Sequence, residues 1–184
     1  MADKSVSRLE FWSGTLLSAA TILVSIWSTR AEIVAEQEAT RRAKAAEQLG
    51  ELSASVNELS SQLESHAGMF VEVEFCLKEK QASPNSCWQK EYSFNPSESG
   101  AAWRALEAER ASLRPYLHGE SELALIDQFS EIKSSHSKDI KSLLPPITPE
   151  AARNVSNRIL DTKLQLGQKY SALEKSISDR VRER

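Results

Sequence analysis

The sequence predicts an all-α protein, in which a single N-terminal transmembrane helix precedes a long coiled-coil-like helix packed in a three- or four-helix bundle. Three observations support this prediction. Residues 9–28 are an apolar stretch with no charged residue after Phe11. From Leu49 onward, apolar residues recur at alternating three- and four-residue intervals, the periodicity of one helix face. Helix-forming residues dominate the composition, with only six glycines and six prolines in 184 residues.

The first predicted element is the membrane helix over residues 9–28. At 1.5 Å per residue, a helix of roughly twenty residues spans about 30 Å, the thickness of the hydrocarbon layer. Trp12 and Trp27 stand near its two ends, where indole rings prefer the membrane interface. A cleaved signal peptide would need small residues near Trp27 instead, so we expect an uncleaved anchor. Serines and threonines dilute the segment, and an interfacial or a buried soluble helix is the alternative.

Small and hydroxyl residues form a stripe along this helix. Gly14, Ser18, Thr21 and Ser25 are spaced four, three and four residues apart, so they share one helix face. Membrane helices approach each other closely through such faces. The stripe therefore predicts that two copies of the chain associate through their membrane helices.

The orientation of the chain across the membrane is predicted from the basic residues that flank residues 9–28 and from the two cysteines. The tail, residues 1–8, carries Lys4 and Arg8, and only Arg30 lies equally close on the other side. Positively charged flanks stay in the cytoplasm, although Arg41 and the bases just after it count the other way. We expect a single-pass protein of a bacterial inner membrane, with its C-terminal domain outside the cytoplasm.

A polar helical stalk is predicted over residues 29–48, and a helical bundle over residues 49–184. Alanines and charged residues fill the stalk, whereas a heptad seam starts at Leu49 and takes His66 into one polar position. The other seam positions are Leu52, Val56, Leu59, Leu63, Phe70, Val73 and Leu77.

Three further helices complete the predicted bundle, over residues 97–114, 120–143 and 149–184. Pro115 ends the first of these, and Pro145 and Pro146 end the second. Thr148 is a suitable N-cap for the last helix, with Pro149 in its first turn. The expected inward residues are Trp103, Leu106, Leu113, Leu125, Ile126, Phe129, Ile132, Ile140, Leu143, Val155, Ile159, Leu166, Tyr170, Leu173, Ile177 and Val181.

A loop is predicted over residues 81–98, which are rich in serine, proline and asparagine. Cys76 and Cys87 flank a turn in this region, and their spacing matches no zinc or redox motif. They form either a structural disulfide outside the cytoplasm or a pair of reduced thiols. The loop aromatics either cap the core or contact a partner; they are Trp88, Tyr92 and Phe94.

No catalytic, cofactor-binding or metal-binding motif is found. The three histidines form no ligand spacing, the glycines never cluster, and no serine lies in a nucleophile elbow. A net charge of −3 without a long basic run argues against nucleic acid as a partner. We therefore expect a non-enzymatic, membrane-anchored interaction or scaffold protein that contacts the lipid bilayer, a protein partner and a second copy of itself.

The alternative is an extracytoplasmic sensor-like or lytic envelope component. The layout of short tail, single span and helical domain is similar to that of phage inner-membrane spanins and of helical sensor domains. The similarity lies in the organisation of the chain and in no shared motif.

Overall fold

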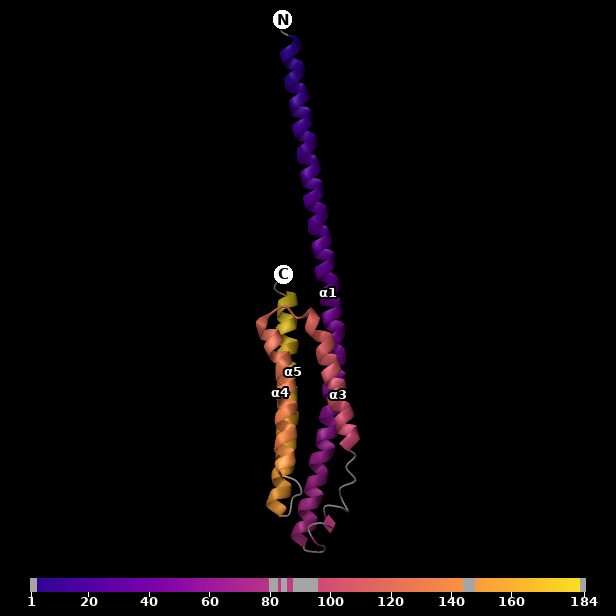
Figure 1. The fold of residues 1–184 in the computed structure, drawn as a ribbon, viewed down its shortest axis with the longest axis vertical. Coiled ribbons are helices and arrows are strands. Elements are labelled where there is room, and N and C mark those ends of the chain that lie inside the picture. The colour runs from indigo at the N-terminus through magenta and orange to yellow at the C-terminus, as the bar shows by residue number, and fades with distance from the viewer. Residues whose placement is uncertain (1–2, 80–82, 84–85, 88–95, 144–147, 183–184) are drawn as a thin grey trace. The chain divides into compact units, whose positions relative to one another are not determined.

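The computed structural model (Figure 1) describes the backbone of residues 3–79, 83, 86–87, 96–143 and 148–182. Within helices, the side chains of residues 3–20, 96–99, 142–143 and 181–182 lie outside the description. The described residues form four long helices and no strand. These helices are α1 (Asp3–Glu79), α3 (Pro96–Leu113), α4 (Glu120–Leu143) and α5 (Pro149–Arg182), and a 3-10 turn, η1 (Arg114–Tyr116), follows α3. The predicted all-α class is confirmed.

The chain divides into two compact units, Met1–Ala43 and Lys44–Arg184, and α1 contributes residues to both. In the first unit, α1 is continuous from Asp3. Within the part of the chain that is described, no helix has the length and apolarity needed to cross a membrane. The predicted span over residues 9–28 is therefore not supported there and stays a prediction, and the side chains of its first twelve residues lie outside the description.

The second unit is a bundle of four helices that run alternately in opposite directions (Figure 1). Three pairs of contacts establish the packing partners. Lys163 of α5 binds Glu64 of α1, with 2.6 Å between Nζ and Oε2. Ser130 of α4 donates a hydrogen bond to Glu107 of α3, and α4 packs closely against α5. The predicted bundle thus contains four helices.

The apolar seam of α1 forms one wall of the core. Leu52, Leu59 and Val73 are completely buried, and the other apolar seam positions between them are nearly so. The other helices cover this wall with most of their predicted inward residues, whereas Leu125, Ile140 and Tyr170 are partly buried and the side chains of Leu143 and Val181 lie outside the description. Among the described residues, Phe129 of α4 is the largest fully buried side chain. The burial of Leu49, Leu52, Val56, Leu59, Leu63, Phe70 and Val73 confirms the predicted seam. His66 and Leu77 are partly exposed, so the seam is less completely buried at these two positions.

The helices begin and end close to the residues that were predicted to limit them. Pro115 has no amide hydrogen to donate, and α3 ends two residues before it and continues as η1. Thr148 caps α5 as expected, because its Oγ1 accepts a hydrogen bond from the amide of Ala151 at 3.1 Å. The start of α4 has a cap that was not predicted, in which Glu122 accepts from the amide of His118 at 3.0 Å.

Replacement of Leu59 by alanine tests the seam. Leu59 is fully buried, and truncating a buried leucine typically lowers the free energy of unfolding by about 2–5 kcal/mol. Urea unfolding of the full chain should show this loss. Glu58→Ala, at the exposed neighbouring position, should change the free energy by no more than about 0.5 kcal/mol. Equal effects of the two substitutions would contradict the seam.

Candidate functional site

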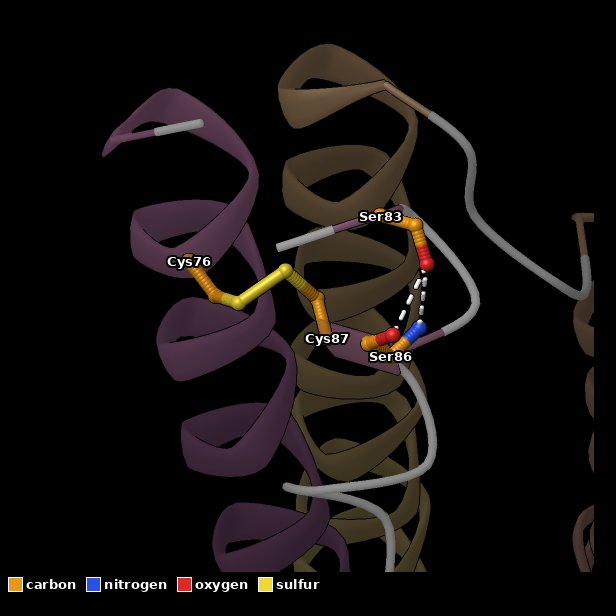
Figure 2. The surroundings of a disulfide bond; sticks show 4 residues. All are labelled: Cys76, Ser83, Ser86 and Cys87. Atoms are coloured by element: carbon orange, nitrogen blue, oxygen red, sulfur yellow. Dashed lines mark hydrogen bonds between the residues drawn. A yellow bond between two sulfur atoms is a disulfide. The ribbon is translucent and has the colours of Figure 1, made fainter. Parts of the chain in front are cut away.

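Cys76 and Cys87 are joined by a disulfide, with sulfur atoms 1.99 Å apart and Cα atoms 5.7 Å apart (Figure 2). Cys76 lies in the last turns of α1, and Cys87 follows a tight turn. In that turn, the amides of Ser86 and Cys87 both donate to the carbonyl oxygen of Ser83, and the two serine hydroxyls lie 2.8 Å apart. The turn brings Cys87 into a fully buried position beside α1. The disulfide therefore ties residue 87 to the core near the end of α1.

An ion cluster lies close to this disulfide, since Glu74 and Lys78 are each two residues from Cys76 in α1. Oε1 of Glu74 binds Arg153 Nη2 at 2.5 Å and Lys78 Nζ at 2.6 Å. These hydrogen bonds hold the pKa of the Glu74 carboxyl at about 2, against a partial burial that acts in the opposite direction. Hydrogen bonding to Glu74 also raises the pKa of Arg153. Because Glu74 is on α1 and Arg153 on α5, the cluster joins the two helices at this end of the bundle.

The opposite end of the bundle has its own buried carboxylate. Glu122 of α4 is 3% exposed and accepts hydrogen bonds from Arg180 Nη1 at 2.8 Å and from the His118 amide. An ionised carboxylate is stable in such a place only when it is paired and hydrogen-bonded. Both ends of the bundle are therefore closed by ion pairs that involve α5.

A polar layer crosses the middle of the bundle. It contains one residue from each helix: His66 from α1, Trp103 from α3, His136 from α4 and Thr162 from α5. Nδ1 of His136 lies 3.0 Å from the Thr162 hydroxyl oxygen, and the Trp103 and His136 rings are 5.7 Å apart. Thr162 gives its own hydrogen to the carbonyl oxygen of Arg158. His136 is therefore the donor to Thr162, which places its proton on Nδ1.

The surroundings of His136 favour its neutral form. Burial and, to a lesser extent, the nearby His66 lower the pKa of the imidazole from 6.5 to about 4, and Asp139 acts in the opposite direction. None of the described residues form a group of three histidine, cysteine or acidic side chains suited to a metal ion. The contact between a neutral histidine and the threonine to which it donates is a structural hydrogen bond, so this layer helps to align the four helices.

A groove of about 770 Å³ runs along the outside of the bundle between α1 and α5. Asn57 and Ser60 line it from α1, and two leucines stand at its edge on α5. Leu160 is 42% exposed and Leu164 is 60% exposed. Sequence reasoning missed this groove because only the inward stripe of α5 was considered. The signal that would have revealed it is the pair of leucines four residues apart, away from that stripe.

The apolar segment of α1 in the first unit is also exposed. Large side chains of residues 22–27 leave half or more of their surface uncovered on several sides of the helix; they are Ile22, Leu23, Val24, Ile26 and Trp27. Of the predicted stripe, Thr21 and Ser25 are exposed, whereas the side chains of Gly14 and Ser18 lie outside the description. The predicted partner-contact residues Trp88, Tyr92 and Phe94 also fall outside the described residues.

Searches of protein-family models, of curated proteins and of solved structures return no match to this chain.

The pKa of His136 predicts how stability changes with pH. Because the folded-state pKa of about 4 lies below the unfolded value of 6.5, the unfolded state binds more protons between these values. The contribution of His136 to the free energy of unfolding is therefore complete above pH 6.5 and is lost as the pH falls to 4. It amounts to about 3 kcal/mol, at 1.4 kcal/mol per pKa unit. Urea unfolding at several pH values measures it.

The matched variants are His136→Asn and His118→Asn. Asparagine at 136 keeps a donor for Thr162 and removes the titration, so the free energy of unfolding should fall by less between pH 6.5 and pH 4. His118 is exposed, and its replacement should leave the pH profile of the wild type unchanged. A steep profile that persists in His136→Asn would show that another group is responsible.

Proposed function

We propose that this protein is a non-enzymatic interaction or scaffold protein that is anchored in a membrane by residues 9–28. The exposed apolar side chains of residues 22–27 carry the proposal. A contiguous patch of five large apolar side chains rarely faces water in a monomeric protein. An apolar surface on several sides of one helix suits surrounding lipid better than a single protein partner, which would cover one side.

The polar groups of this segment are satisfied within the helix. Ser25 donates its hydroxyl hydrogen to the carbonyl oxygen of Thr21 at 2.9 Å, and Ser28 donates to the carbonyl oxygen of Ser25 at 3.0 Å. A helix that supplies partners for its own hydroxyl groups avoids the cost of unpaired polar groups in hydrocarbon. The hydroxyl residues that dilute the segment are therefore compatible with a membrane position.

The disulfide supports a place outside the cytoplasm for the bundle. Disulfides persist in oxidising compartments and are rare in the reducing cytoplasm. Cys76 and Cys87 are bonded and no other cysteine occurs in the sequence. The polar groups in the described core form structural hydrogen bonds and ion pairs. An anchored bundle with such a core would act by binding a partner. The groove between α1 and α5 is the surface that it offers to a partner.

Acidic substitutions in residues 9–28 test the anchor. Leu17→Asp combined with Leu23→Asp places two charges in the apolar stretch, each at a cost of roughly 3 kcal/mol in the centre of a bilayer. The wild-type chain should stay with the membrane pellet after alkaline carbonate, and the double variant should enter the supernatant. Glu36→Asp, outside the stretch, is the control. Release of the wild-type chain by carbonate would refute the anchor.

Thiol labelling tests the compartment. In protein unfolded without reductant, a maleimide probe should label neither cysteine, and after reduction it should label both. Closing a loop of eleven positions stabilises a protein by about 3 kcal/mol, so reduction should also lower the urea midpoint. Labelling of both thiols in freshly isolated, unreduced protein would remove the argument for an extracytoplasmic bundle.

A further inference from the structure

The groove side of α5 carries a stripe whose two halves complement each other. Its centre is Gln168, with Leu164 and Ala172 four residues to either side, and Asp161 and Lys175 seven residues to either side. Steps of four and seven residues stay on one face of a helix. All five side chains are exposed, and four of them line the groove.

An antiparallel copy of the same stripe matches it in one register. When two such helices are related by a twofold axis at Gln168, Leu164 of each copy faces Ala172 of the other, so a protruding side chain meets a small one. Asp161 of each copy then faces Lys175 of the other, and opposite charges meet twice. A parallel pair would instead place Asp161 against Asp161 and Lys175 against Lys175, which like-charge repulsion disfavours.

The groove provides the space for this second helix. Gly167 lies at its middle, and a side-chain atom added there would meet nothing within 4 Å. Ser60 of α1 and Ser171 of α5 are also small groove residues.

We propose that α5 pairs with α5 of a second copy of this chain, antiparallel and centred on Gln168, to form a twofold-symmetric dimer. Such an interface is isologous, because the same patch serves both copies. The proposal goes beyond membrane anchoring and does not depend on it. Within this dimer the bundle segments of the two α1 helices run in opposite directions, so this pairing is distinct from the predicted association of two anchors side by side in one bilayer. The test is therefore made in detergent.

Cysteine cross-linking of the full chain tests the register. Gln168→Cys lies on the proposed axis, where the two Cα atoms come near enough for a disulfide, which needs a separation of roughly 4.4–6.8 Å. Mild oxidation should convert most of this variant to a dimer on a non-reducing gel. Glu174→Cys is the control, because an exposed residue six positions from the axis lies about 18 Å along the helices from its counterpart. Dimer yields that are equal for the two variants would refute the proposal.

A mixing experiment distinguishes antiparallel from parallel pairing. Chains with Asp161→Cys and chains with Lys175→Cys should cross-link when mixed and not when each is oxidised alone. Self-cross-linking of either variant, with no gain on mixing, would show a parallel pair and overturn the register.

Surface substitutions in the Gln168→Cys background test the energetics. Leu164→Glu should reduce the dimer yield at least tenfold, whereas Val71→Glu, at an exposed apolar residue outside the groove, should leave it unchanged. Asp161→Lys should weaken cross-linking roughly three- to tenfold, and adding Lys175→Asp should restore it. A yield that does not respond to Leu164→Glu would show that this stripe is not the interface.

Discussion

The burial of the α1 seam is the interaction on which the rest of the structure depends. A helix with an apolar stripe from Leu49 to Val73 must cover that stripe, since each fully buried leucine or valine contributes about 1.5–3 kcal/mol relative to exposure to water. The three later helices present matching stripes, and together they form one contiguous core around Phe129. The helix directions, the position of the disulfide and the outer groove all follow from this packing.

Polar contacts select one alignment among those that the apolar stripes permit. Apolar packing alone tolerates a shift of one helix along another, because similar side chains recur every turn. The Glu74–Arg153 pair and the Glu122–Arg180 pair hold α5 at its two ends, and His136 holds it near its middle through Thr162. A shift by one turn would leave a buried carboxylate and a buried imidazole without partners, and such groups cost more than an apolar contact supplies.

The two units of the chain differ in how their apolar side chains are used. In the bundle, leucines and valines are covered by other helices, whereas Leu23 and Val24 of the first unit are about two-thirds exposed. The described part of the chain offers no cover for them, and the proposed bilayer would supply it. Leu164 presents the same problem on a smaller scale on α5, and there the proposed cover is a second copy of the chain.

Local physics was enough for the sequence to determine the helices of this protein. Periodicity identified the seam, Pro115 and Thr148 marked helix ends, and the limits of α4 agree with the predicted range of 120–143. Contacts between residues far apart in sequence were decided only by the tertiary structure. Glu74 and Arg153 are 79 positions apart, and nothing near either residue indicates the other. The groove, the polar layer and the number of helices in the bundle likewise depend on which helix faces meet. The periodicity of one helix cannot predict this, because it identifies an apolar face but not the helix that packs against it.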